Sequence, residues 1–273
     1  MIKTQAKSSQ SINAKSAAAK KESKAVAQDT NTEKKPRFYE SWTFLILFCV
    51  VLPMLIRSFL YTPFHIPSGS MKSGLLVGDY IFVSKYAYGY SKYSLPFSPD
   101  IFEGRKWFTP PKRGDVVVFR LPTNTSIDYI KRVIGLPGDK IQVQQGVLYI
   151  NGKAVPRKKT GTFVDNEQGQ ETTLDTYTET LPNGVSYTVL DQTPYGMLDN
   201  TQIYTVPEHH YFMMGDNRDN SQDSRVQEIV GYVPEENLIG QAKMVLMSVD
   251  SPFWQFWRWP FTLRSGRFFT LIH

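Results

Sequence analysis

The segment DYIKRVIGLPGD, which runs from Asp128 to Asp139, decides the fold. Its first half is rich in β-branched and aromatic residues, and its second half contains a Leu-Pro-Gly-Asp turn. A short run of this kind, bounded by Gly and Pro, predicts a β-strand over 129–134. Similar runs lie at 80–83, 115–120 and 140–143, and no long amphipathic helix accompanies them. The sequence therefore predicts a mainly β protein built on an antiparallel sheet.

A hairpin and a polar insertion follow this strand. Residues 147–150 and 153–155 flank Asn151-Gly152, and Asn-Gly supplies the two positive φ angles of a type I′ turn. Residues 156–205 are polar, rich in Thr and weakly patterned. We therefore expect one β domain over 61–273, with an inserted β subdomain at about 141–205.

One lysine lies within the apolar strand that opens this segment. Burial disfavours the ammonium form, so Lys131 could be neutral there and act as a general base. The alternative is a lysine on an edge strand that faces water, which is the usual position of this residue type. The strand pattern alone leaves both interpretations open.

An apolar segment precedes the β domain. Residues 41–56 are sixteen uncharged, mostly apolar residues, and one flanking charge extends the run to nineteen residues, either 38–56 or 42–60. A helix of that length spans ~28 Å, close to the ~30 Å of a bilayer's hydrocarbon core. A cleaved signal peptide is disfavoured because the basic region before the run is too long and no small-x-small site follows. We expect a transmembrane helix over 38–60 in preference to a buried soluble helix.

The positive charge of the chain is confined to its first residues. Residues 1–37 hold nine basic and three acidic residues, which accounts for the whole net charge of +6. Such a polar segment predicts a disordered tail, and its Lys bias makes a mitochondrial transit peptide the weaker alternative. Basic residues next to a span stay on the cytoplasmic side. The tail is therefore expected in the cytoplasm and residues 61–273 outside it, and the neutral remainder argues against binding to nucleic acid.

Residue types that bind metals or form disulfides are scarce. Cys49 is the only cysteine, which excludes an intrachain disulfide framework and a Cys-cluster metal site. The four histidines show no metal-ligand spacing except one adjacent pair, and no nucleotide-binding glycine motif is present. We expect neither a metal nor a cofactor.

Two further polar segments could carry chemistry. Pro67-Ser68-Gly69-Ser70-Met71 places a hydroxyl between Gly and Met, where it is accessible, although an ordinary Gly/Ser linker has the same composition. The segment GDNRDNSQDSR, residues 215–225, is much longer than a turn requires. Its length favours a fixed hydrogen-bond network.

In this order, and after an apolar span, the three segments resemble the signature boxes of the bacterial type I signal peptidases, or leader peptidases. The resemblance extends from about residue 64 to residue 239. It implies a membrane-anchored endopeptidase that cleaves signal peptides from preproteins after small residues. Ser70 matches the nucleophile and Lys131 the general base of a Ser-Lys pair, a known variant of triad logic.

The resemblance also implies roles for neighbouring residues. Ser68 matches the side-chain donor to the oxyanion, and Ser221 matches a serine that hydrogen-bonds the base lysine. Positions that match supporting or structural residues are Arg132, Asp216, Asp223 and Arg225. Positions that match the small substrate pockets are Phe64, Ile66, Pro67, Met71, Tyr129 and Ile130.

The chain departs from the family in the loop behind the nucleophile. The family's first box usually continues Met-x-Pro-Thr-Leu, whereas this chain has Ser73-Gly74 in place of Pro-Thr. Both replacements widen the range of φ that the backbone can adopt, so the loop is expected to be less rigid than in the family. Some family members also carry two spans before the catalytic domain, whereas one is visible here.

The aromatic C-terminal part favours contact with a bilayer. Residues 252–261, PFWQFWRWPF, contain Trp254, Trp257 and Trp259 beside Arg and Pro. Tryptophan is enriched at membrane interfaces, although burial in a core is the alternative. The expected setting is a single-pass monomer in the bacterial cytoplasmic (inner) membrane, with its catalytic domain on the outer face.

Two other functions remain as alternatives. A LexA-like self-cleaving protease would use the same chemistry, but it requires a DNA-binding domain in place of the span. A non-enzymatic, membrane-anchored β module would not need Ser70 or Lys131.

Overall fold

A computed structural model describes residues 42–95, 98–100, 103–167, 170–193, 195–251 and 255–272. The predicted tail, residues 1–37, lies outside the described residues. The chain divides into two compact units, residues 1–52 and 53–273.

Four short helical segments follow one another after the tail. They are α2 (Trp42–Ile46), the π-helical η2 (Leu47–Val51), α3 (Leu52–Leu55) and the π-helical η3 (Ile56–Leu60). Most of their large apolar side chains are exposed. Within the described residues, no helix is both long enough and apolar enough to cross a membrane. The transmembrane helix over 38–60 therefore stays a prediction.

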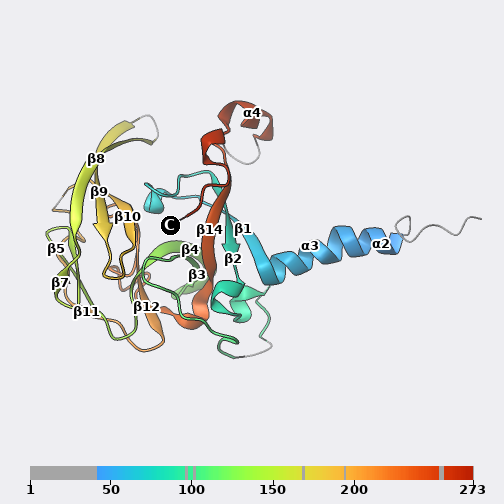
Figure 1. Cartoon of the computed structure of the whole chain (residues 1–273), viewed down its shortest axis with the longest axis horizontal. Helices are drawn as coiled ribbons and strands as arrows, with labels where there is room; N and C mark the ends of the chain where they lie inside the picture. The colour runs from blue at the N-terminus through green and yellow to red at the C-terminus, as the bar shows by residue number, and fades with distance from the viewer. Residues whose placement is uncertain are drawn as a thin grey trace, which may run out of the picture. The chain divides into compact units, whose positions relative to one another are not determined.

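The second unit is built on a seven-stranded sheet with the order β1-β2-β14-β3-β4-β12-β13 (Figure 1). All of its strand pairs are antiparallel, which confirms the prediction of a mainly β protein built on an antiparallel sheet. The predicted strands at 80–83 and 129–134 fall within β2 and β4, and the one at 115–120 overlaps β3 from residue 116. Its strands are β1 (Tyr61–His65), β2 (Asp79–Ser84), β3 (Val116–Leu121), β4 (Asn124–Gly135), β12 (His210–Met214), β13 (Val233–Pro234) and β14 (Leu238–Ser248).

Residues of the expected insertion form two smaller antiparallel sheets. One has the order β11-β5-β6-β7 and the other β10-β9-β8. Asn151 has φ 54° and Gly152 has φ 76°, as the predicted type I′ turn requires. The strands are β5 (Lys140–Gln144), β6 (Val147–Ile150), β7 (Lys153–Ala154), β8 (Arg157–Glu167), β9 (Gln170–Thr180), β10 (Ser186–Asp191) and β11 (Tyr204–Thr205).

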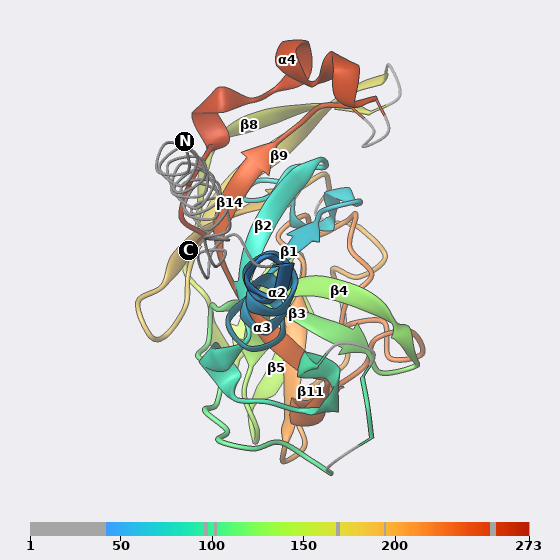
Figure 2. The same ribbon diagram turned by 90° about the vertical axis from the view of Figure 1, so that its right-hand side faces the viewer.

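Short helical turns connect and follow these strands. The last strand, β14, lies beside β2 in the large sheet, and Figure 2 shows α4 beyond it. The turns are η4 (Gly69–Met71), η5 (Tyr86–Tyr88), η6 (Lys92–Ser94), η7 (Glu235–Asn237), η8 (Phe256–Arg258), α4 (Trp259–Thr262) and η9 (Ser265–Arg267).

The core forms where the large sheet meets the insertion and where its strands pack on the loops. Phe212 of β12 is fully buried, and its ring lies 5.1 Å from that of Tyr204 and 6.2 Å from that of Tyr232. A second apolar cluster joins side chains of β2, β3, β4 and β14 to Ile66 and Met71. These two clusters hold the loop that carries Ser70 and the strand that carries Lys131 in fixed positions.

Phe212→Ala is expected to lower the free energy of unfolding by about 3–5 kcal/mol, because it leaves a cavity among packed side chains. Denaturant unfolding of the full chain in detergent measures the change. Ile203→Ala is the control: this apolar side chain is 58% exposed, so its loss should change stability by less than about 0.5 kcal/mol. Equal losses in the two variants would contradict this assignment of the core.

Candidate active site

Ser70 lies in η4, on the loop that joins β1 to β2. We call residues 66–78 the Ser70 loop. Backbone hydrogen bonds close it at its base, from Ile66 to Asp79 at 2.9 Å and from Gly78 to Ile66 at 3.0 Å. Ser70 is 8% exposed. The hydroxyl is thus held in a short, closed turn, and not in a free linker.

Lys131 reaches the Ser70 loop from the large sheet. It lies on β4 opposite Val117 of β3, and its side chain is buried. Its Nζ lies 2.5 Å from Ser70 Oγ, within hydrogen-bond distance. The structure therefore brings together two residues that are 61 positions apart in the sequence.

Burial lowers the pKa of Lys131 to about 8. The nearby Asp223 and Asp216 carboxylates oppose this shift, and the Arg225 guanidinium adds to it. The Tyr129 ring lies 5.3 Å from Nζ and covers one side of the amine. Near pH 8, a substantial fraction of Lys131 is neutral, so it can accept a proton from the hydroxyl that it contacts.

Two buried ion pairs flank the lysine. Arg132 contacts Asp216 through two hydrogen bonds, Nε to Oδ1 at 2.9 Å and Nη2 to Oδ2 at 2.7 Å. Arg225 contacts Asp223 in the same manner, with both bonds at 2.9 Å. Each carboxylate is therefore neutralised in place by a guanidinium whose two N–H groups match its geometry.

The segment 215–225 also holds the Ser70 loop directly. The backbone N–H of Asn217 donates to the Ser70 carbonyl at 3.1 Å, and its side-chain Nδ2 donates to the Gly69 carbonyl at 3.1 Å. Gly215 packs so closely that a Cβ would lie 2.6 Å from the Ser70 carbonyl oxygen. The sequence pattern did not assign a role to Asn217; its only signal was its place in the long polar run.

Ser221 lies beside Gly215, and its side chain is buried. Within the described residues its Oγ makes no hydrogen bond to Lys131, and its influence falls instead on Asp223, whose pKa it helps to lower. Ser68, in contrast, is exposed and borders the same cleft as Ser70. The two expected serines thus occupy different environments beside the Ser70–Lys131 pair.

A cleft of about 730 Å³ opens over this pair. Three of the expected substrate-contact residues, Pro67, Tyr129 and Ile130, line it. Ile66 and Met71 are instead 2% and 1% exposed in the core, and Phe64 packs against the same cluster. Residues that line the cleft without having been predicted include Met197, Leu198, Gln222 and Ile229.

The free edge of β4 borders this cleft. Strand β12 pairs with β4 only at Arg132, Val133 and Gly135. Among the described strands, none therefore pairs with that edge of β4 over residues 127–131. An extended peptide in the cleft could hydrogen-bond to these main-chain groups by adding a strand.

The C-terminal aromatics lie away from this cleft. Trp257 is 61% exposed and Phe261 in α4 is 90% exposed, whereas Trp259 is half-buried. Trp254 lies outside the described residues. The described part thus presents large apolar groups to solvent around α4.

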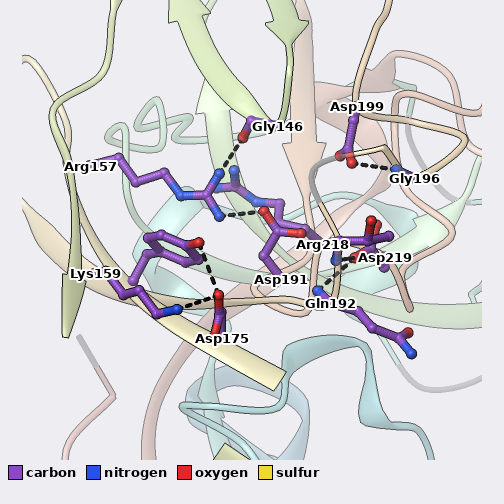
Figure 3. A network of polar contacts seen from close by, with 12 residues as sticks. Gly146, Arg157, Lys159, Asp175, Asp191, Gln192, Gly196, Asp199, Arg218 and Asp219 are labelled. Carbon is purple, nitrogen blue, oxygen red and sulfur yellow. Dashed lines mark hydrogen bonds and ion pairs between the residues drawn. The ribbon is translucent and has the colours of Figure 1, made fainter. Parts of the chain in front are cut away.

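Three carboxylates, two from the insertion and one from the polar segment 215–225, lie close enough to hold a cation. Oxygen atoms of Asp191, Asp199 and Asp219 are within 4.8 Å of one another, the sole such group in the described part of the chain. Figure 3 shows that Arg157 and backbone N–H groups already donate to them: Arg157 to Asp191, Gly196 to Asp199, and Gln192 to Asp219. We therefore assign these three carboxylates a structural role, in which they hold residues 191–199 and 219 together, and not a role in binding a cation.

Comparisons with known proteins find a matching family and several similar proteins. Residues 39–247 match the family described as signal peptidase, peptidase S26. A signal peptidase I of Rickettsia typhi is 46% identical over 233 residues, covering 82% of this chain and 84% of its own. One of Rickettsia canadensis is 44% identical over 235 residues, covering 83% and 86%. A crystal structure of a signal peptidase I from Enterococcus faecalis is 27% identical, with coverage of 49% and 97% and a TM-score of 0.29.

The pH dependence of Ser70 reactivity tests the state of Lys131. The rate at which a small activated ester acylates Ser70 should rise with pH, with a midpoint near 8, because only the neutral amine accepts the proton. Lys85 is the matched control, since burial also lowers its pKa to about 8. Lys85→Met should keep the midpoint and Lys131→Met should abolish the pH-dependent rise; the reverse result would contradict the assignment.

Asn217→Ala should slow the same acylation by about 10-fold, because it releases the Gly69 carbonyl beside Ser70. Its cost in stability should be about 1 kcal/mol, as for the loss of one hydrogen bond. Asn237 is the control, since its Nδ2 donates to the Arg120 carbonyl at 2.9 Å away from the cleft. Asn237→Ala should lower stability similarly and leave the rate intact. Equal rates of acylation in the two variants would contradict a role for Asn217 in positioning Ser70.

Proposed function

The chain belongs to the signal peptidase family, peptidase S26, and we propose that it removes signal peptides from preproteins with Ser70 as nucleophile and Lys131 as general base. One observation carries the assignment of residues. A buried lysine with a pKa of about 8 lies 2.5 Å from a serine hydroxyl at the base of a cleft.

The reaction begins with the transfer of one proton. Neutral Lys131 accepts the proton of Ser70, and Ser70 Oγ attacks the carbonyl carbon of the scissile peptide bond. The Lys131 ammonium then gives a proton to the leaving amine, so the bond breaks and an acyl-enzyme remains. A water molecule, deprotonated by Lys131, hydrolyses the ester and restores both residues.

The tetrahedral intermediates need donors for their oxyanion. The backbone N–H of Ser70 and the hydroxyl of Ser68 are the two groups that we assign to this role. Ser68 is exposed and lines the same cleft, so its hydroxyl can turn toward a bound carbonyl. Loss of one such donor typically lowers the rate by about 10²–10³-fold.

The substrate is proposed to bind as an added strand on the free edge of β4. Main-chain bonds to residues 127–131 would hold an extended peptide across Ser70. The cleft walls supplied by Tyr129, Ile130 and Met197 are apolar. Small side chains at alternate substrate positions, the first and the third before the cut, would fit against such walls. Secretory cleavage sites have small residues at these positions.

The membrane assignment rests on two apolar surfaces that are each exposed. The side chains of residues 45–56 are mostly exposed along the helical segments, and Trp257, Phe261 and Phe269 are exposed near the C-terminus. We assign the first to a single-pass anchor with a cytoplasmic N-terminus, and the second to the outer interface of the cytoplasmic membrane. The catalytic domain is proposed to act there as a monomer.

Cleavage of a preprotein by the purified full chain tests the proposal. Ser70→Ala should lose activity entirely and Lys131→Ala should lose at least about 10³-fold, because the hydroxyl then lacks a base. Both variants should still unfold at wild-type temperatures within a few degrees. Full activity in either variant would refute the mechanism. An inactive wild-type chain, tested on several preproteins, would favour the non-enzymatic β module.

A further inference from the structure

The loop behind Ser70 contains a backbone conformation that is unfavourable on its own. Ser73 has φ 106°, a region that non-Gly residues avoid, and Gly74 follows it in place of the family's Pro-Thr. A loop with such a backbone keeps one conformation only where surrounding groups fix it. The groups that fix this loop therefore determine where Ser70 Oγ lies.

Two of those groups come from the inserted sheet β10-β9-β8. Lys72 Nζ lies 2.7 Å from both carboxylate oxygens of Asp165 on β8. Ser73 Oγ donates to the Thr188 carbonyl of β10 at 2.7 Å. The insertion thus holds the two residues that immediately follow the Ser70 turn.

The Lys72–Asp165 pair is buried. Its side chains are 7% and 15% exposed, so water screens the attraction little. Separation would move a buried ammonium away from the Asp165 carboxylate, which is unfavourable. The β8–β9 hairpin therefore cannot leave the Ser70 loop without a large penalty.

We propose that the Lys72–Asp165 ion pair is a clamp that positions Ser70, and that this is a function of the inserted sheet. Lys72 is a positioning residue, because it acts through the backbone two residues from Ser70 and not on the reacting atoms. The charges that set the pKa of Lys131 are Asp223, Asp216 and Arg225. The clamp should therefore change the geometry of Ser70 and leave the pH midpoint of the reaction unchanged.

The same hairpin offers a matched control. Lys159 and Asp175 form an ion pair of 2.6 Å between β8 and β9, but their side chains are 55% and 37% exposed (Figure 3). Lys159→Met removes a lysine from the same hairpin without touching the Ser70 loop. It separates the clamp from a general effect of the hairpin's charge.

The test compares Lys72→Met, Lys159→Met and the exchanged pair Lys72→Asp with Asp165→Lys, each as the full chain in detergent. Lys72→Met should lower kcat for preprotein cleavage by about 10- to 100-fold, since a displacement of about 1 Å costs that much. Its KM should stay within about threefold, because the cleft walls are untouched. Lys159→Met should have the kcat of the wild type. The exchanged pair should have a kcat at least about threefold higher than that of Lys72→Met.

Unchanged kcat in Lys72→Met would overturn the clamp, as would an equal loss in Lys159→Met or an exchanged pair no faster than the single variant. A shifted pH midpoint would also overturn it, because the lysine would then act through charge. Assays are run well below each variant's melting temperature, and Asp165→Asn, which keeps the shape of the carboxylate, replaces Lys72→Met if that variant does not fold.

The clamp rests on the proposed function, and Ser70→Ala separates the two. Activity that survives in Ser70→Ala refutes Ser70 as the nucleophile. An inactive Ser70→Ala beside a fully active Lys72→Met refutes the clamp alone.

Discussion

The burial of one amine against one hydroxyl is the constraint on which the site depends. The pKa of Lys131 falls toward the range of a general base only because burial removes the amine from water, since burial is the largest influence on that pKa. Exclusion of water requires every other charge near it to be paired within the protein. Arg132–Asp216 and Arg225–Asp223 meet that requirement with two hydrogen bonds each. The long polar segment 215–225 supplies Asp216, Asp223 and Arg225, three of the charged groups that are paired around the buried Lys131.

The second partner, Ser70, is held in place by two separate parts of the chain, the polar segment 215–225 and the inserted sheet. Asn217 holds the carbonyl groups of Gly69 and Ser70 from the segment that also carries Asp216. Lys72 and Ser73 contact the inserted sheet on the other side of the turn. A serine in a loop can meet a strand lysine at 2.5 Å only if both ends of its turn are restrained in this way.

Local patterns predicted the strands and the Asn151-Gly152 turn because each depends on neighbours in the sequence. They could not show that Lys131 contacts Ser70, because that contact depends on the register of β3 against β4 and on how a short turn is oriented. The same limit explains Ile66 and Met71: the turn directs them into the core, not into the cleft. Met197 lines the cleft from a loop of the insertion, where no periodic pattern marks it.

The net charge of residues 38–273 is zero. Many of the opposite charges that cancel lie in specific ion pairs. Several opposite charges meet in the interior, among them Arg218 with Glu179, both side chains at most 3% exposed. Replacing such a pair with packed apolar groups often leaves a protein equally stable, so buried pairs are weak evidence for stability. Their directional hydrogen bonds do, however, limit the positions that the joined segments can take. In this chain those segments are the Ser70 loop, the polar run and the inserted sheet, and only their correct placement gives a hydroxyl that a neutral lysine can reach.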